Sequence, residues 1–101
     1  MSVPVQAISY VESQGHEQCL YMIGWSKEKL YTRLTMAQLE ELLFPQGFLR
    51  VHKQYLVNMT YLQSLQSTGA VLTTGKSLKA SARNYRENQK KFVNWKAQQL
   101  W

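Results

Sequence analysis

The 101-residue sequence contains no aspartate, because all six of its acidic residues are glutamate. A phosphorelay receiver accepts its phosphate on an Asp, a Walker-type NTPase usually holds Mg²⁺ through one, and an EF-hand loop begins with one. None of these three sites can be built from this sequence. Cysteine is also scarce: the single Cys19 excludes an internal disulfide and a Cys-based zinc cluster, as expected in a reducing cytoplasm.

Long apolar runs are missing as well. No segment approaches the roughly 20 apolar residues that a membrane-spanning helix needs, and the N-terminus lacks the basic and apolar sections of a signal peptide. We therefore expect a cytoplasmic protein with no membrane insertion. Its 45% hydrophobic and 18% charged residues are typical of a globular protein. The length predicts a single domain over residues 1–101.

The formal charge of +6 is distributed unevenly along the chain. Residues 1–47 carry three basic and five acidic residues, whereas residues 48–101 carry nine basic residues and a single acid, Glu87. A positive field of this kind attracts nucleic acid, an anionic membrane surface or an acidic protein, and duplex DNA is the commonest partner of a compact basic domain. A solvated basic surface without a partner is the alternative interpretation.

Alternating apolar and polar residues predict strands in both halves of the sequence. In the first half they predict three antiparallel strands, at residues 3–11, 18–25 and 30–34. In the second half they predict a further group, at residues 48–52, 59–65, 71–74 and 78–80. Strands and helices do not alternate in the way that indicates a parallel sheet, so the expected fold class is mainly β.

Two helices interrupt this pattern. Thr35, with Gln38 three residues later, forms a capping box, and it precedes an apolar stripe made of Met36, Leu39, Leu42 and Leu43. A C-terminal helix is predicted from Ser81 onward, with an apolar face made of Tyr85, Phe92 and Trp95. Both apolar stripes are expected to be core rather than cofactor sites.

Candidate catalytic and metal-binding patterns are weak. The segment 70–77 matches a loose phosphate-loop pattern, but its residues favour a strand and a strand follows, so we expect a β-turn at Gly75-Lys76. His16, His52 and Cys19 lack the spacing of a metal site or of a Cys/His pair, and Cys19 is expected to be a buried apolar residue. We therefore expect no enzyme, no metal site and no cofactor.

The segment 48–58, Phe-Leu-Arg-Val-His-Lys-Gln-Tyr-Leu-Val-Asn, resembles the signature of the LytTR DNA-binding domain of bacterial response regulators. The resemblance covers about residues 5–95, because 8–13, 39–42 and 80–85 match in the same order. It therefore implies a core at about 5–95 and a tail at 96–101. It implies an elongated fold of about ten strands in small antiparallel sheets with short helices. It also implies a transcription regulator that binds duplex DNA at repeated half-sites, as a homodimer on these repeats, with side chains from loops in successive major grooves.

Carried over by position, the resemblance gives three side chains the role of reading bases: His16, Lys53 and Arg83. Arg forms a bidentate pair with guanine O6 and N7, Lys reaches the same acceptors, and His donates to either. Contacts to the DNA backbone, which fix register, are assigned to Arg50, His52, Gln54, Lys79, Asn84 and Arg86. An alternative role for His52 is to support the Lys53 loop by a hydrogen bond, and Asn58 is expected to cap the backbone.

Two other functions stay open at this level. The runner-up is a protein-interaction module that captures a regulatory partner through its basic face and its C-terminal residues Trp95, Leu100 and Trp101. Removal of residues 96–101 would separate the two functions, because it should abolish partner binding and spare DNA binding. An RNA-binding protein is the third choice, because the sequence shows no clustered aromatic platform.

Overall fold

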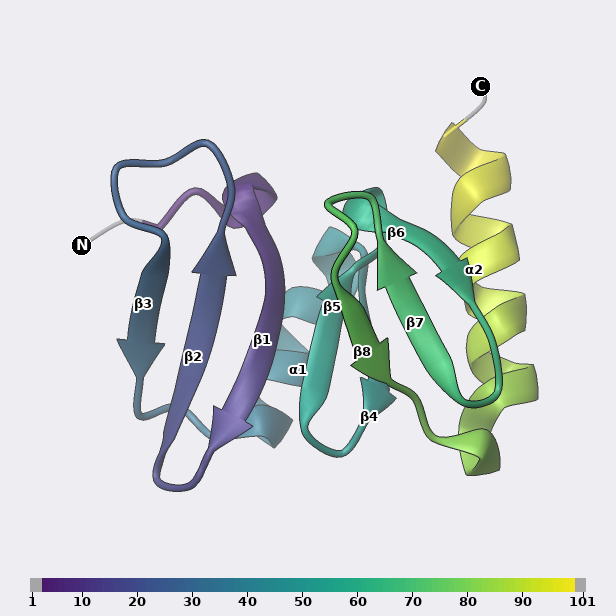
Figure 1. Ribbon diagram of the computed structural model, residues 1–101, viewed down its shortest axis with the longest axis horizontal. Coiled ribbons are helices and arrows are strands. Elements are labelled where there is room, and N and C mark those ends of the chain that lie inside the picture. The colour runs from purple at the N-terminus through teal and green to yellow at the C-terminus, as the bar shows by residue number, and fades with distance from the viewer. Residues whose placement is uncertain (1–2, 100–101) are drawn as a thin grey trace.

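The computed structural model describes residues 3–99, which form eight strands and two α-helices (Figure 1). The strands are β1 (Ile8–Gln14), β2 (Glu17–Met22), β3 (Lys29–Thr32), β4 (Phe48–His52), β5 (Tyr55–Asn58), β6 (Leu62–Leu65), β7 (Gly69–Leu72) and β8 (Ser77–Lys79). The helices are α1 (Met36–Leu43) and α2 (Tyr85–Gln99), and short 3-10 turns occur at Val5–Ala7, Phe44–Gln46, Met59–Tyr61 and Ala82–Asn84.

Both sheets are antiparallel, which confirms the mainly β fold class. The larger sheet has the strand order β3-β2-β1-β5-β4, and the smaller one has the order β6-β7-β8. In Figure 1, α1 lies behind the larger sheet, and α2 runs along the far side of the smaller sheet. The three strands expected in the first half are β1, β2 and β3, and they pair as successive hairpins.

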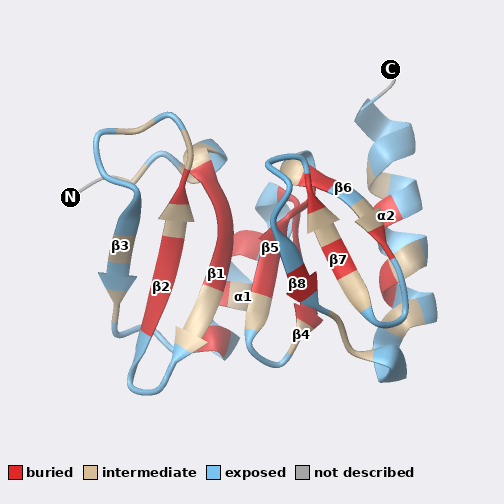
Figure 2. Ribbon diagram, in the orientation of Figure 1, coloured by how far each residue is buried: buried red, intermediate tan, exposed pale blue. Residues whose placement is uncertain are grey.

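The larger sheet has an apolar core on each face. Leu56 packs with α1 on one face, while its neighbour Val57 packs with the smaller sheet on the other, and Phe48 and Leu49 divide in the same way. This division follows from the pleat, since successive residues of a strand point to opposite faces. Phe92 of α2 completes the core beneath the smaller sheet. Figure 2 shows the buried residues concentrated in β1, β2, β4 and β5.

Helix α1 begins as predicted. Thr35 Oγ1 accepts a hydrogen bond from the Gln38 N–H at 3.1 Å, and Gln38 Oε1 accepts one from the Thr35 N–H at 2.9 Å, which completes the capping box. Three members of the predicted apolar stripe are buried, but Leu42 is 60% exposed, so its place in the core was predicted wrongly. A narrow helix face is enough here because α1 covers the sheet with only two turns.

Several strand predictions need correction. The strand expected at residues 3–11 begins only at Ile8, and the one expected at 59–65 begins only at Leu62, because a 3-10 turn precedes each of them. Strand β5 was not predicted. The described chain has eight strands rather than about ten. With extents of 34 × 31 × 25 Å, the molecule is also less elongated than the resemblance implied.

Helix α2 uses its aromatic face as predicted. Phe92 is buried, and Tyr85 and Trp95 pack half-buried against the same core. Trp95 also fixes the approach of a neighbouring loop, because Gly47 has φ of +91° and a Cβ there would lie 2.8 Å from Trp95 Nε1. A residue with a side chain at position 47 would therefore be strained and would displace the indole.

The last part of the chain is only partly described. Residues 96–99 of the expected tail continue α2, whereas Leu100 and Trp101, which the interaction hypothesis invoked, lie outside the described residues. Neither helix in residues 3–99 is long and apolar enough to cross a membrane.

Two of the weak candidate sites have structural roles. Cys19 is fully buried, as expected. The segment 70–77 ends β7 and turns into β8, with Gly75 at φ of +94° and the Leu72 N–H donating to the Lys76 carbonyl at 2.8 Å. A β-turn rather than a phosphate loop is therefore present, but it spans Leu72–Gly75, closed by the Gly75 N–H donating to the Leu72 carbonyl at 2.9 Å, and so lies slightly before the expected Gly75-Lys76.

Candidate nucleic-acid interface

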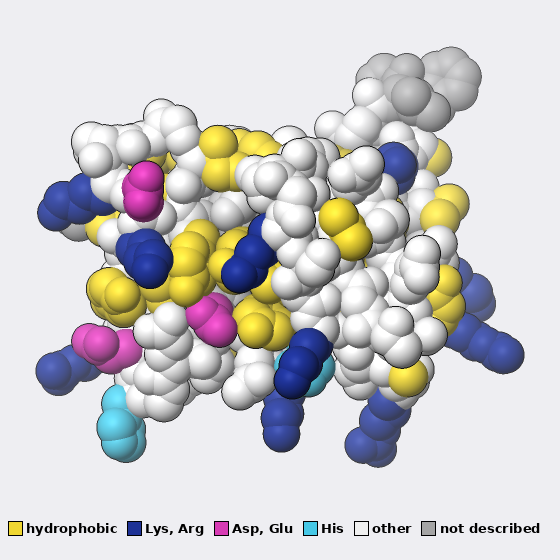
Figure 3. Space-filling model, in the orientation of Figure 1, with side chains coloured by type: hydrophobic (Ala, Val, Ile, Leu, Met, Phe, Trp, Pro, Cys, Tyr) yellow, Lys and Arg dark blue, Asp and Glu magenta, His cyan; other side chains and the backbone are white. Residues whose placement is uncertain are grey.

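The three predicted base-reading residues lie on three separate connections at one edge of the molecule. His16 lies in the β1–β2 turn, Lys53 in the β4–β5 turn and Arg83 in the 3-10 turn before α2, and all three are exposed. These connections follow one another along the lower edge of Figure 1. In Figure 3, Lys, Arg and His side chains project from that edge, whereas the acidic side chains of this face lie toward β1–β3.

The β1–β2 turn is short because its flanking residues pair directly. Gln14 pairs with Glu17, so only Gly15 and His16 form the turn, and Gly15 supplies the φ of +74° that such a tight reversal requires. The His16 side chain lies beside a shallow hollow that it shares with Arg33, the residue that follows β3. The turn thus holds an imidazole at its tip, with a second basic side chain close by.

The β4–β5 turn has Lys53 and Gln54 at its tip. His52 pairs with Tyr55, and a register shift between Arg50 and His52 accommodates the turn although neither tip residue has a positive φ. The Gln54 N–H donates to His52 Nδ1 at 3.1 Å. This contact favours the supporting role for His52, because it occupies one ring nitrogen in shaping the loop that presents Lys53.

Backbone hydrogen bonds join the three connections. The Ser13 N–H donates to the Gln54 carbonyl at 2.9 Å, which links the end of β1 to the β4–β5 turn. The Ser81 N–H donates to the Val51 carbonyl at 2.7 Å, which links the segment before Arg83 to β4. Because main-chain contacts fix the relative positions of these loops, the side chains at their tips project from a preorganised edge.

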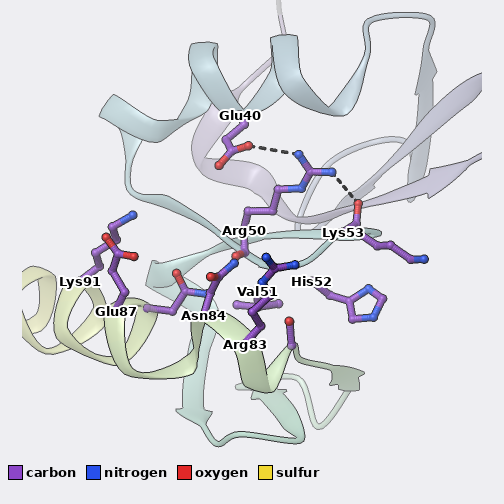
Figure 4. A pocket seen from close by; sticks show the side chains of 11 residues that line it. Glu40, Arg50, Val51, His52, Lys53, Arg83, Asn84, Glu87 and Lys91 are labelled. Atoms are coloured by element: carbon purple, nitrogen blue, oxygen red, sulfur yellow. Dashed lines mark hydrogen bonds and ion pairs between the residues drawn. The ribbon is translucent and has the colours of Figure 1, made fainter.

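A cleft of about 540 Å³ lies between α1, the end of β4 and the start of α2. Four basic side chains line it, those of Arg50, Lys53, Arg83 and Lys91, and two acidic ones, those of Glu40 and Glu87. Figure 4 shows the Lys53 side chain and the His52 ring extending away from the centre of this cleft, whereas Arg50 runs across it toward α1.

Arg50 is placed differently from the other predicted backbone contacts. Its Nη1 donates to Glu40 Oε1 at 3.2 Å, and its Nη2 donates to the Lys53 carbonyl at 2.7 Å. Arg50 and His52 are half-buried, whereas the remaining four predicted backbone contacts are exposed, namely Gln54, Lys79, Asn84 and Arg86. The four exposed side chains can reach a phosphate, whereas the Arg50 guanidinium already forms two hydrogen bonds within the protein.

Glu12 gathers hydrogen bonds behind the two turns of the larger sheet. Its Oε1 accepts from Tyr21 Oη at 2.9 Å and from Gln14 Nε2 at 3.1 Å, and its Oε2 accepts from Tyr55 Oη at 3.4 Å. Burial alone would raise the pKa of the Glu12 carboxyl, but these hydrogen bonds outweigh it and hold the pKa below its ordinary value of 4.5. The ionised carboxylate thereby ties β1, β2 and β5 together.

We predict that Glu12 makes the fold sensitive to acid. Because its folded-state pKa is lowered, its contribution to stability is complete above the ordinary pKa and is lost as pH falls through the folded-state value. Lowering the pH from about 7 to about 3 should therefore lower the thermal unfolding midpoint more for the wild-type protein than for Glu12→Gln. An identical acid shift in both proteins would contradict this assignment.

Burial also raises the pKa of Tyr10 to about 12, with the nearby Glu12 charge as the next cause. The Tyr10 ring stacks on Tyr21 with centroids 4.4 Å apart and is itself buried. This pair is therefore part of the packing between strands rather than an open platform for bases.

Comparison with known proteins identifies the fold and the family. A family model described as the LytTr DNA-binding domain matches residues 1–93. The chain belongs to this family. LytTr domains bind DNA, and the resemblance inferred from residues 48–58 is confirmed. No curated protein matches the sequence.

A solved structure agrees with this assignment. The LytTr DNA-binding domain of a Bacillus cereus protein described as a methyl-accepting/DNA response regulator has a TM-score of 0.74 and is 16% identical. The match covers 92% of this chain and 86% of that one. At this identity the likeness establishes the LytTr fold but does not assign roles to individual side chains.

Sequence reasoning missed three residues at this edge. Arg33 could have been found from the hairpin, because Gln18 pairs with Thr32 and the next residue must lie near the β1–β2 turn. Glu12 and Glu40 could not: Glu12 meets Tyr55 from another strand of the sheet, and Glu40 meets Arg50 only because α1 packs against the larger sheet. Within residues 3–99, no three His, Cys or Glu side chains are placed to hold a metal ion.

Proposed function

We propose that this LytTr domain reads specific sequences in duplex DNA as part of a transcription regulator, with His16, Lys53 and Arg83 contacting bases in the major groove. The observation that carries the proposal is that three exposed side chains, each able to donate to a base edge, lie on three loops of one edge. Backbone hydrogen bonds between these loops support it further. Preorganised loops lose less entropy on binding than mobile ones.

The dimensions of the domain suit this proposal. Equivalent faces of successive major grooves lie about 34–36 Å apart along B-DNA. The longest extent of the domain is 34 Å, and the β1–β2 turn and the start of α2 lie toward opposite ends of this axis in Figure 1. With the reach of the Arg83 and His16 side chains added, one domain can address neighbouring grooves, and two copies can occupy repeated half-sites.

Each reader has a base edge that fits its chemistry. The Arg83 guanidinium offers a rigid fork for guanine O6 and N7, and the Lys53 ammonium reaches the same acceptors as a point donor. The His16 imidazole donates one hydrogen bond to a purine N7. Arg83 and Lys53 therefore favour guanine, whereas His16 accepts either purine.

The exposed polar residues around the readers suit contacts with the DNA backbone. Lys79 ends β8 and Arg86 lies in the first turn of α2, and both are exposed beside the edge that carries the readers. Gln54 and Asn84 directly follow Lys53 and Arg83 and can hydrogen-bond to phosphate oxygens. Such contacts fix the register without selecting a base.

We predict that Lys79→Ala weakens binding to every duplex by a similar factor. A lysine that neutralises one phosphate releases about one counterion, so the slope of log K against log salt concentration should become shallower by about one unit. Titrations of a specific and a random duplex over a salt series measure this change. An unchanged slope would exclude Lys79 as a phosphate contact.

The test of the proposed function is selection from a randomised duplex library at about 150 mM salt, where binding by charge alone is weakened. Enrichment of a short repeated sequence would support a sequence-reading domain. Retention of DNA without any enriched sequence would contradict the proposal and leave only non-specific binding.

A further inference from the structure

We propose that the contact between Arg50 and Glu40 is a clamp that positions the Lys53 turn for base reading, so that Arg50 acts within the protein rather than on a DNA phosphate. This inference rests on the proposed function, because it concerns how one of the three readers is presented. Arg50 is thus a positioning residue and Glu40 its anchor on α1.

The fork of the Arg50 guanidinium joins two different parts of the fold. One terminal nitrogen donates to the Glu40 carboxylate on α1, and the other donates to the main-chain carbonyl of Lys53 itself. Figure 4 shows both contacts on opposite sides of the guanidinium. The Lys53 carbonyl has no other partner in the β4–β5 pairing, since it lies in the turn. Arg50 therefore restrains the tip residue directly.

The anchor is rigid because α1 is fixed at both its start and its buried face. The capping box at Thr35 holds the first turn, and Leu39 and Leu43, on either side of Glu40 in sequence, are buried against the larger sheet. Arg50 projects to the same face of the sheet as Phe48, two residues earlier, which packs with α1. Strand pleat and helix packing together bring the two charges into contact.

The backbone of β4 is held on its other side as well. Asn88 of α2 donates through Nδ2 to the Arg50 carbonyl at 3.0 Å, and the Ser81 N–H donates to the Val51 carbonyl. The strand that leads to Lys53 is thus fixed by α2 and by the segment before Arg83. What remains adjustable is the turn itself, which the Arg50 side chain and the His52 ring restrain.

The geometry is unfavourable for a phosphate contact by Arg50. Its side chain is 29% exposed, its Nε is buried, and each terminal nitrogen already donates one hydrogen bond within the protein. Turning the guanidinium outward would break both hydrogen bonds and leave the Lys53 carbonyl and the Glu40 carboxylate without their partner. The neighbouring Lys53 and Arg83 can meet DNA without any such loss.

The test uses a pair of matched substitutions, of which only one should weaken binding to the selected site. Glu40→Ala and Glu41→Ala each remove one negative charge from α1, and Glu41 is exposed. Loss of a negative charge near DNA should by itself tighten binding to all duplexes. The clamp predicts instead that Glu40→Ala weakens binding to the selected site about three- to fivefold and leaves the random duplex unchanged or tighter, whereas Glu41→Ala weakens neither.

A second variant separates positioning from phosphate binding. Arg50→Lys keeps the positive charge but loses the rigid fork that reaches two acceptors. The clamp predicts lower affinity for the selected site, little change on the random duplex and an unchanged salt slope. Equal losses on both duplexes, or no loss on the selected site, would overturn the proposal, as would equal tightening by the two glutamate variants.

One readout is independent of DNA. The Gln54 amide, which hydrogen-bonds to His52 in the intact turn, should exchange its hydrogen faster in Glu40→Ala than in Glu41→Ala, while thermal unfolding midpoints stay close to wild type. Equal exchange in both variants would overturn the clamp. If wild-type protein enriches no sequence but the exchange difference is present, the proposed function fails and the clamp survives as a structural feature.

Discussion

Arg83→Ala is expected to lower the affinity for the selected duplex by about 1–3 kcal/mol, which is roughly a five- to 150-fold increase in Kd. The loss on a random duplex should be much smaller. The reason is that a bidentate arginine contact to guanine exists only when the correct base is present, whereas a backbone contact forms on any sequence. Titration of both duplexes at the same salt concentration measures the two losses.

The location of Arg83 makes this variant easy to interpret. The residue lies exposed in a 3-10 turn. Two hydrogen bonds to β4 hold the chain on either side of it, one from the Ser81 N–H and one from the Asn88 side chain. Truncation of the side chain therefore removes a donor without removing a core contact. Arg86→Ala is the matched control, because Arg86 is also exposed and lies close by, in the first turn of α2.

The control should behave as a phosphate contact. We expect Arg86→Ala to weaken the selected and the random duplex by similar factors and to make the salt slope shallower by about one unit. If Arg83→Ala gives the same pattern as Arg86→Ala, then Arg83 holds the backbone and the base-reading assignment is wrong. If Arg83→Ala weakens mainly the selected duplex and Arg86→Ala weakens both, then residues 83 and 86 face different parts of the DNA.

Local patterns predicted much of the fold. The capping box at Thr35 and the glycine at position 75 act within a few residues, so their structures follow from the sequence around them. The strands of the first hairpins were also found, although both of their faces are buried, because turn residues bound their runs of apolar residues. Recognition of the segment 48–58 then supplied the family, which periodicity alone could not.

Other features depend on contacts between distant elements. Strand β5 was missed because its four residues, buried on both faces except at Tyr55, show no alternation. The 3-10 turns before β1 and β6 break patterns that read as continuous strand in the sequence. Leu42 was placed in the core because its spacing from Leu39 fits a helix face, although α1 contacts the sheet through a narrower stripe.

The same distinction applies to the candidate site. The order of His16, Lys53 and Arg83 along the chain and their position in loops were predictable, and their exposure agrees with a role at the surface. The direction of Arg50 was not, because it is decided by Glu40 on a helix that packs against the sheet from another part of the sequence. A basic residue in a signature segment can thus serve the turn rather than the ligand.

Asn58, the last residue of that segment, provides the prediction with the largest expected effect on stability. It is fully buried, its Nδ2 donates to the Ile8 carbonyl at 2.9 Å, and its Oδ1 accepts from the Thr60 N–H at 3.0 Å. Asn58→Ala would leave both main-chain groups without these partners. Since each unsatisfied buried group costs about 1–3 kcal/mol, we expect the free energy of unfolding to fall by about 2–4 kcal/mol.

Chemical denaturation measures this loss, and two further variants test its cause. Asn94→Ala, at an exposed position of α2, should change stability by less than about 0.5 kcal/mol. Asn58→Asp keeps the acceptor for Thr60 but removes the donor for Ile8 and buries a charge, so its loss should be at least as large as that of Asn58→Ala. A stable Asn58→Asp protein would show that the Ile8 contact is dispensable. If the losses of stability rank as expected, with both Asn58 variants far above Asn94→Ala, then Asn58 links the start of β1 to the end of β5. These two strands carry Glu12 and Tyr55 behind the reading turns.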